Sequence, residues 1–280
     1  MPSFSTPGGV SVTVNLPVGD LLVLASDRSE TVVSTTGMND PSQIRVSYQD
    51  RQLVIDGPQP RESWSSWLGF GESIRVRIDL PEGSTVKAVV LEGEVRGVGR
   101  LGACTFRTDG GEIVLDETGP LTVTTDSGDV SVRRVAGRAE VTSDSGVVQI
   151  EHVDGSVGIT NQYGETEIGE VTGDLLLRGH DADLVVGHAR RSVDAYTESG
   201  DIRIDKAEGE TVNATSDSGS IEINIPEDVT ATLDLDSRQG HVRNSPGLET
   251  GNSSTERITV SARSKSGDIS IGRFRPSAGL

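Results

Sequence analysis

The stretch that decides the fold is residues 125–132, Thr-Asp-Ser-Gly-Asp-Val-Ser-Val. A turn built from Asp, Ser and Gly is followed by alternating apolar and polar residues, and this alternation directs one side of a strand toward a core. The pattern returns at residues 197–204, Thr-Glu-Ser-Gly-Asp-Ile-Arg-Ile, and at residues 265–271, Lys-Ser-Gly-Asp-Ile-Ser-Ile. The chain is therefore expected to consist of many similar turn-and-strand units.

Glycines separate these units at fixed intervals. One series has a spacing of 18 residues, with Ala182 at the one position that lacks glycine and with Gly219 following after one extra residue. A second series lies half a period away, with Arg191 at its exceptional position. Such self-similarity is typical of repeat proteins, so each 18-residue coil is predicted to hold two nine-residue units. The first series is Gly110, Gly128, Gly146, Gly164 and Gly200, and the second is Gly119, Gly137, Gly155, Gly173 and Gly209.

The apolar residues follow the glycines at constant distances and predict the core. They stand two and four residues after each turn, and a third column precedes the second turn. Equivalent strands of stacked coils pair in parallel at about 4.8 Å, and the usual crossover preference favours right-handed winding. The predicted fold is all-β, a right-handed parallel β-solenoid (β-helix) of 18-residue, two-strand coils. The predicted inward residues include Val130, Val132, Val148, Ile150, Leu184, Val186, Ile202, Ile204, Ile221 and Ile223, and the third column is Val135, Val153, Val171, Ala189 and Ala207.

The two ends of the chain lack the regular glycine spacing but still have strand-like alternation. We predict an N-terminal β cap of degenerate coils over residues 1–85, a regular solenoid over residues 86–240, and a C-terminal loop with capping strands over residues 241–280. Caps are expected because a bare terminal coil exposes unpaired backbone groups and invites edge-to-edge association.

An insertion at residues 61–71 concentrates aromatic residues in a chain that has few of them. One interpretation is a loop that folds over the end of the solenoid and buries its core. The other is an exposed patch that binds a protein partner or a second copy of the chain. The candidate partner-binding residues are Trp64, Trp67, Leu68 and Phe70.

The net charge of −18 decides which partners are unfavourable. An acidic protein repels nucleic acid and anionic lipid head groups, so neither is expected as a partner. The first residues resemble no signal peptide, and no apolar run is long enough to insert into a membrane. These features predict a cytoplasmic protein.

Residues that could carry out catalysis are sparse. Cys104 stands between apolar neighbours and is expected to be a buried thiol. The four histidines lack metal-ligand spacing, and most of them are expected on the surface or in turns. The sequence therefore predicts no catalytic residues, no cofactor and no enzymatic activity.

Calcium is an alternative that the turn carboxylates leave open, because nine-residue units with Gly and Asp turns are similar to β-rolls that bind this ion. Solvated turn carboxylates are the simpler interpretation. The candidate calcium ligands are Asp126, Asp129, Asp144, Asp201 and Asp217.

The repeated units quoted above resemble a bacterial domain-of-unknown-function family of β-strand-repeat proteins labelled putative adhesin. The resemblance spans nearly the whole chain, and actinobacterial members look most similar. It implies a β-solenoid without catalytic residues or cofactor, and it says little about activity.

We therefore expect a non-enzymatic interaction scaffold that binds a protein partner or itself. A surface adhesin is the first alternative, and a calcium-binding β-roll-like protein is the second.

Overall fold

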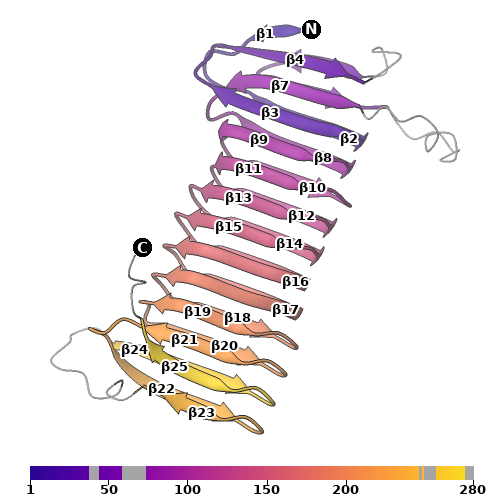
Figure 1. Ribbon diagram of the computed structural model, residues 1–280. Helices are drawn as coiled ribbons and strands as arrows, with labels where there is room; N and C mark the ends of the chain where they lie inside the picture. The colour runs from indigo at the N-terminus through magenta and orange to yellow at the C-terminus, as the bar shows by residue number, and fades with distance from the viewer. Residues whose placement is uncertain (38–43, 59–73, 246–247, 249–256, 275–280) are drawn as a thin grey trace, which may run out of the picture. The chain divides into compact units, whose positions relative to one another are not determined.

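The computed structural model describes residues 1–37, 44–58, 74–245, 248 and 257–274. These residues form strands and turns, with no helix among them (Figure 1). The all-β prediction is confirmed. No helix that could cross a membrane is found in this part of the chain. The backbone contacts divide the protein into two units, Met1–Ala136 and Gly137–Leu280, which are described in turn. The domain boundaries at 85/86 and 240/241 stay predictions.

In unit 1, successive strands alternate between two parallel ladders. The first ladder contains β6, β2, β8, β10 and β12, and the second contains β7, β3, β9, β11 and β13. Antiparallel strands flank them, since β5 pairs with β6, β4 pairs with β7, and β1 pairs with β4. The strands are β1 (Ser3–Ser5), β2 (Ser11–Val18), β3 (Asp20–Ser26), β4 (Glu30–Thr36), β5 (Arg45–Gln49), β6 (Gln52–Asp56), β7 (Arg75–Pro81), β8 (Thr85–Glu92), β9 (Val95–Arg100), β10 (Cys104–Thr108), β11 (Ile113–Thr118), β12 (Leu121–Ser127) and β13 (Val130–Val135).

Unit 2 continues the same alternation, but two of its strands run through both ladders. β16 and β17 are each 15 residues long and pair side by side along most of their length. Further along the chain, β24 lies between β20 and β22, and β25 lies between β21 and β23. The strands are β14 (Ala139–Ser145), β15 (Val148–Val153), β16 (Val157–Val171), β17 (Leu175–Ala189), β18 (Val193–Thr197), β19 (Ile202–Ala207), β20 (Thr211–Ser216), β21 (Ile221–Ile225), β22 (Thr230–Ser237), β23 (Val242–Asn244), β24 (Arg257–Ser264) and β25 (Ile269–Arg273).

The register shows where the repeat holds and where it changes. In unit 2, Val157 pairs with Leu175, 18 positions further on. In unit 1, Cys104 pairs with Leu121, which is only 17 positions further on. The 18-residue glycine spacing predicts that Gly110 stacks on Gly128. This prediction is wrong, because the coil between them is one residue shorter. Gly111 takes the place, and its carbonyl oxygen lies 2.2 Å from where a Cβ on Gly128 would be.

The aliphatic interior agrees with the predicted columns. Val130, Val148 and Ile202 are each at most 1% exposed, and every other predicted inward residue named above is also buried. Burial of apolar side chains at about 25 cal/mol per Å² is the main favourable contribution to folding. The sequence-based choice of core residues is therefore confirmed.

A second interior column is polar and was not predicted. It lies three residues before the glycine of the turns of the first series and carries mainly Ser or Thr. The Ser216 hydroxyl donates to the Gly200 carbonyl at 2.9 Å, and the Asn161 amide donates to the Gly146 carbonyl at 3.0 Å. These bonds give half-buried turn carbonyls a hydrogen-bond partner. The members in unit 2 are Ser143, Asn161, Thr197, Ser216 and Ser264.

Replacing Gly164 by Ala is expected to destabilise the protein. The Gly164 φ is +126°, and a Cβ there would lie 2.3 Å from the Gly146 carbonyl oxygen. Backbone strain of this kind costs about 1–3 kcal/mol, before the cost of moving the neighbouring coil. Gly158→Ala is the matched control, because nothing lies within 4 Å of the added Cβ. Urea unfolding should show a lower midpoint for Gly164→Ala only; equal loss in both variants would contradict this account.

Candidate functional site

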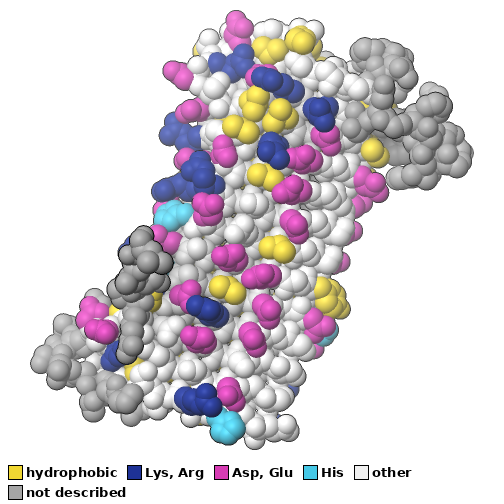
Figure 2. Space-filling view, in the orientation of Figure 1, with side chains coloured by type: hydrophobic (Ala, Val, Ile, Leu, Met, Phe, Trp, Pro, Cys, Tyr) yellow, Lys and Arg dark blue, Asp and Glu magenta, His cyan; other side chains and the backbone are white. Residues whose placement is uncertain are grey.

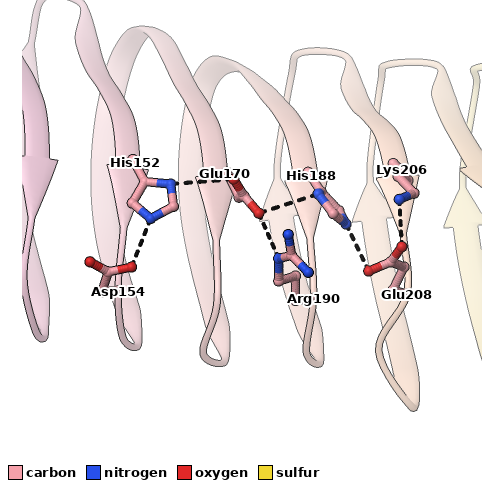
Figure 3. A network of polar contacts seen from close by, with 7 residues as sticks. All are labelled: His152, Asp154, Glu170, His188, Arg190, Lys206 and Glu208. Atoms are coloured by element: carbon pink, nitrogen blue, oxygen red, sulfur yellow. Dashed lines mark hydrogen bonds and ion pairs between the residues drawn. The ribbon is translucent and has the colours of Figure 1, made fainter. Parts of the chain in front are cut away.

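The first candidate site is a column of ionisable side chains along one side of unit 2. His152, Glu170, His188 and Lys206 stand in register near the ends of β15, β16, β17 and β19. The turns that follow add Asp154, Arg190 and Glu208 (Figure 3). We call these seven residues the His–Glu column. Parallel in-register strands bring them together, because residues 18 positions apart become neighbours.

Each histidine of the column lies between two carboxylates. His152 is 2.7 Å from Asp154 through Nε2 and 3.3 Å from Glu170 through Nδ1. His188 is 3.5 Å from Glu170 through Nδ1. Its Nε2 atom is 2.8 Å from Glu208 Oε2, at an angle outside the range of a regular hydrogen bond. The two imidazoles are only 26% and 19% exposed, so water competes weakly for these contacts.

Two cations complete the column. Arg190 Nε lies 2.5 Å from Glu170 Oε1, and this hydrogen bond, together with the nearby positive charges, lowers the pKa of Glu170 despite partial burial. Burial alone would raise the pKa of Glu208, but the close contacts with Lys206 and His188 outweigh it and lower this pKa. Lys206 Nζ also lies 5.5 Å from the centre of the Phe274 ring.

The His–Glu column consists of polar groups that pair with one another between adjacent coils, and these contacts favour the stacking of coils. Opposite charges on adjacent strands contribute up to about 1 kcal/mol per pair. The column was not predicted, because the histidines taken one by one show no metal-ligand spacing. The signal that could have found it is the 18-residue spacing of His152, Glu170, His188 and Lys206.

The calcium candidates have other partners or belong to different units. Asp126 and Asp129 are in unit 1, whereas Asp144, Asp201 and Asp217 are in unit 2. Asp201 Oδ1 accepts from the Ser220 amide at 2.8 Å, and Asp217 Oδ2 lies 2.5 Å from Lys265 Nζ. Within the described ranges, no three His, Cys, Asp or Glu side chains are placed to hold a metal ion.

Cys104 is 2% exposed, and its thiol donates to the Gly102 carbonyl at 3.4 Å. Burial raises the pKa of this thiol to about 12, so the reactive thiolate is strongly disfavoured at neutral pH. The expectation of a buried thiol is confirmed.

Trp64, Trp67, Leu68 and Phe70 lie outside the described residues, and their role in partner binding stays a prediction.

A second candidate site lies on an outer strand face of unit 2. Gly158, Leu176, Asp194 and Asn213 stand in register on β16, β17, β18 and β20. Leu176 is 45% exposed. It occupies an outward position of the alternating pattern, which polar residues occupy in other strands. Around it runs a shallow depression lined also by Arg138, Ser156 and Ser192. We call this surface the Leu176 groove.

Charged side chains are spread over the exposed surface (Figure 2). Figure 2 shows acidic side chains spread over the visible face, with arginines and lysines between them. Many of these charges form exposed pairs, such as Arg77 and Asp79 at 2.8 Å. Exposed pairs of this kind contribute little to stability.

The lowered pKa of Glu170 predicts a pH-dependent stability. A carboxylate whose folded-state pKa lies below its ordinary value of 4.5 stabilises the protein above pH 4.5 and stops doing so as the pH falls through the folded-state pKa. Glu170→Gln should therefore unfold at lower urea concentration than wild type at pH 7, and this difference should shrink below pH 4.5. Glu167→Gln on the outer face of β16 is the control. A difference for Glu170→Gln that is constant with pH would contradict the prediction.

The chain is similar to one known family and to several solved structures. The family model described as Toastrack DUF4097 matches residues 13–272. No curated protein matches the chain. A solved putative adhesin from Bacteroides fragilis is 14% identical, with 96% of this chain and 95% of that chain covered and a TM-score of 0.44. A putative lipid binding protein from Parabacteroides distasonis is 13% identical, with 96% and 95% covered and a TM-score of 0.34.

A putative cell adhesion protein from Clostridium sporogenes is 13% identical, with 97% of this chain and 98% of that chain covered and a TM-score of 0.23. The resemblance drawn from the repeated units is confirmed at the level of the family, whereas the similarity to actinobacterial members stays a prediction. With 260 of its 280 residues matched, from 13 to 272, the chain belongs to the Toastrack DUF4097 family.

Proposed function

We propose that this protein is a non-enzymatic interaction scaffold that binds a protein partner through the Leu176 groove. The scaffold is a right-handed parallel β-solenoid built from coils of about 18 residues with two strands each. The observation that carries the proposal is Leu176 itself, a large aliphatic side chain that is 45% exposed at the centre of a shallow depression.

The surroundings of Leu176 have the composition of a protein-binding surface. Small residues, among them Gly158 and Ser192, leave room for an approaching side chain. Arg138 and Asp194 lie around them as polar residues. Protein interfaces commonly combine an apolar centre with a polar rim, and a few central residues carry most of the binding energy.

The state of the reactive side chains supports a role without catalysis. All four histidines lie next to carboxylates, because His180 Nδ1 is 3.0 Å from Glu198 and His241 Nδ1 is 3.5 Å from Asp268, in addition to the two histidines of the column. Such contacts hold the rings in place, and Cys104 is buried. Burial makes the Cys104 thiol unsuited to nucleophilic chemistry, which supports a role without catalysis.

Leu176→Arg is expected to abolish partner binding without unfolding the protein. Immobilised wild type and variant would be exposed to a lysate of cells that naturally express the chain, and bound proteins quantified by mass spectrometry. A buried charge at the centre of an interface costs several kcal/mol, so partners should be lost at least tenfold. Val242→Arg, at another 45% exposed residue, is the control. Equal capture by Leu176→Arg and wild type, with unchanged circular dichroism, would refute the proposal.

The proposal includes a cytoplasmic location, in contrast to a surface adhesin. The name adhesin belongs to solved structures that are 13–14% identical to this chain. Fractionation of native cells with an antibody against the protein separates the two possibilities. Recovery in the cytoplasmic fraction is expected, whereas recovery on intact cell surfaces would favour the adhesin.

A further inference from the structure

Unit 2 departs from its repeating turn in two adjacent coils. The regular turn is Asp-Ser-Gly, as at residues 144–146 and 217–219. Residues 162–164 instead read Gln-Tyr-Gly, and residues 180–182 read His-Asp-Ala. β16 and β17 run without interruption through these positions, with Gly164 in register with Ala182. Two departures in neighbouring coils bring unusual side chains together at one place.

The new side chains meet at the surface. The rings of Tyr163 and His180 are perpendicular, with centres 5.5 Å apart. Tyr163 is nevertheless 48% exposed, in a chain with only three tyrosines. Both rings line a shallow hollow, which we call the Tyr163 hollow. Its other principal lining residues are Gln162, Arg178, Gly179 and Glu198.

The charges of the Tyr163 hollow are already compensated. The Arg178 guanidinium donates two hydrogen bonds to the Asp194 carboxylate, at 3.1 and 3.0 Å. His180 lies 3.0 Å from Glu198. With no excess positive charge here and a net charge of −18 on the chain, an anionic ligand is disfavoured. The hollow is suited to a neutral ligand that offers both apolar surface and hydrogen-bonding groups.

We propose that the Tyr163 hollow binds a neutral saccharide. The C–H face of a pyranose ring can pack on the exposed part of the Tyr163 ring, whose π system carries partial negative charge. Glu198 can accept hydrogen bonds from sugar hydroxyls, and the Gln162 amide can donate as well as accept. The pairing with Asp194 holds Arg178 in place beside them. No covalent bond is made or broken, and the hollow is lined by other residues than the Leu176 groove, although Asp194 of that groove pairs with Arg178.

Ligand-observed NMR and calorimetric titration test this site with four probes: maltotetraose, cellotetraose, triacetylchitotriose and the acidic sialyllactose. We expect at least one neutral probe to bind, with a Kd at or below about 1 mM, equivalent to roughly −4 kcal/mol. Tyr163→Ala should weaken that binding at least tenfold. Val242→Ala, which changes an equally exposed apolar side chain outside the hollow, should leave it unchanged.

A second variant separates binding from folding. Gln162→Asp combined with Tyr163→Ser restores the turn that residues 144–146 already have, so it should fold normally and still lose saccharide binding. Failure of every neutral probe to bind, binding of sialyllactose alone, or full binding by Tyr163→Ala would each overturn the proposal. Tyr163 does not line the Leu176 groove, so Tyr163→Ala tests the hollow with Leu176 in place, and either proposal can fail while the other stands.

Discussion

The close approach of backbones at the glycine turns is the constraint on which the structure depends. At Gly164 and Gly200, a Cβ would lie 2.3 and 2.2 Å from a carbonyl oxygen of the preceding coil. No side chain fits at that distance, so glycine is required where the turns stack. The turns thus align successive coils, and the strands that leave them pair in a fixed register. Ala182 stands in register with Gly164 in the preceding coil, but its φ is not positive, and a methyl group fits at that one position.

A fixed register turns each position of the repeat into a column with its own chemistry. The inward columns are aliphatic, except for the Ser and Thr column whose hydroxyls bond the turn carbonyls. The outward His–Glu column alternates histidine or lysine with glutamate, so that stacking brings polar partners into contact. Binding surfaces arise where a column is interrupted. Leu176 replaces a polar residue on a strand face, and Tyr163 replaces the serine of a turn.

The sequence predicted the features that depend on local periodicity. Alternation identified the buried strand faces, and glycine spacing located the turns, because both patterns are visible within a few coils. Gly111 was missed because deleting one residue from a coil shifts the stacking without disturbing the alternation. The insertion of β24 between β20 and β22 was also invisible, because Val212 pairs with Val260 across 48 positions. Such pairing depends on how distant coils fit together. Site residues were harder still, since Leu176 and Tyr163 acquire meaning only beside their neighbours in adjacent coils.

The most direct test of the fixed register is an NMR measurement of contacts between β16 and β17. In isotope-labelled protein, nuclear Overhauser effects between amide and Hα protons should connect the residues next to Thr166 with Leu184, and the residues next to Ile168 with Val186. The two residues of each pair are 18 positions apart in the sequence. A different offset, or the short Hα–Hα contacts of antiparallel strands, would contradict the stacking of coils at the glycine turns.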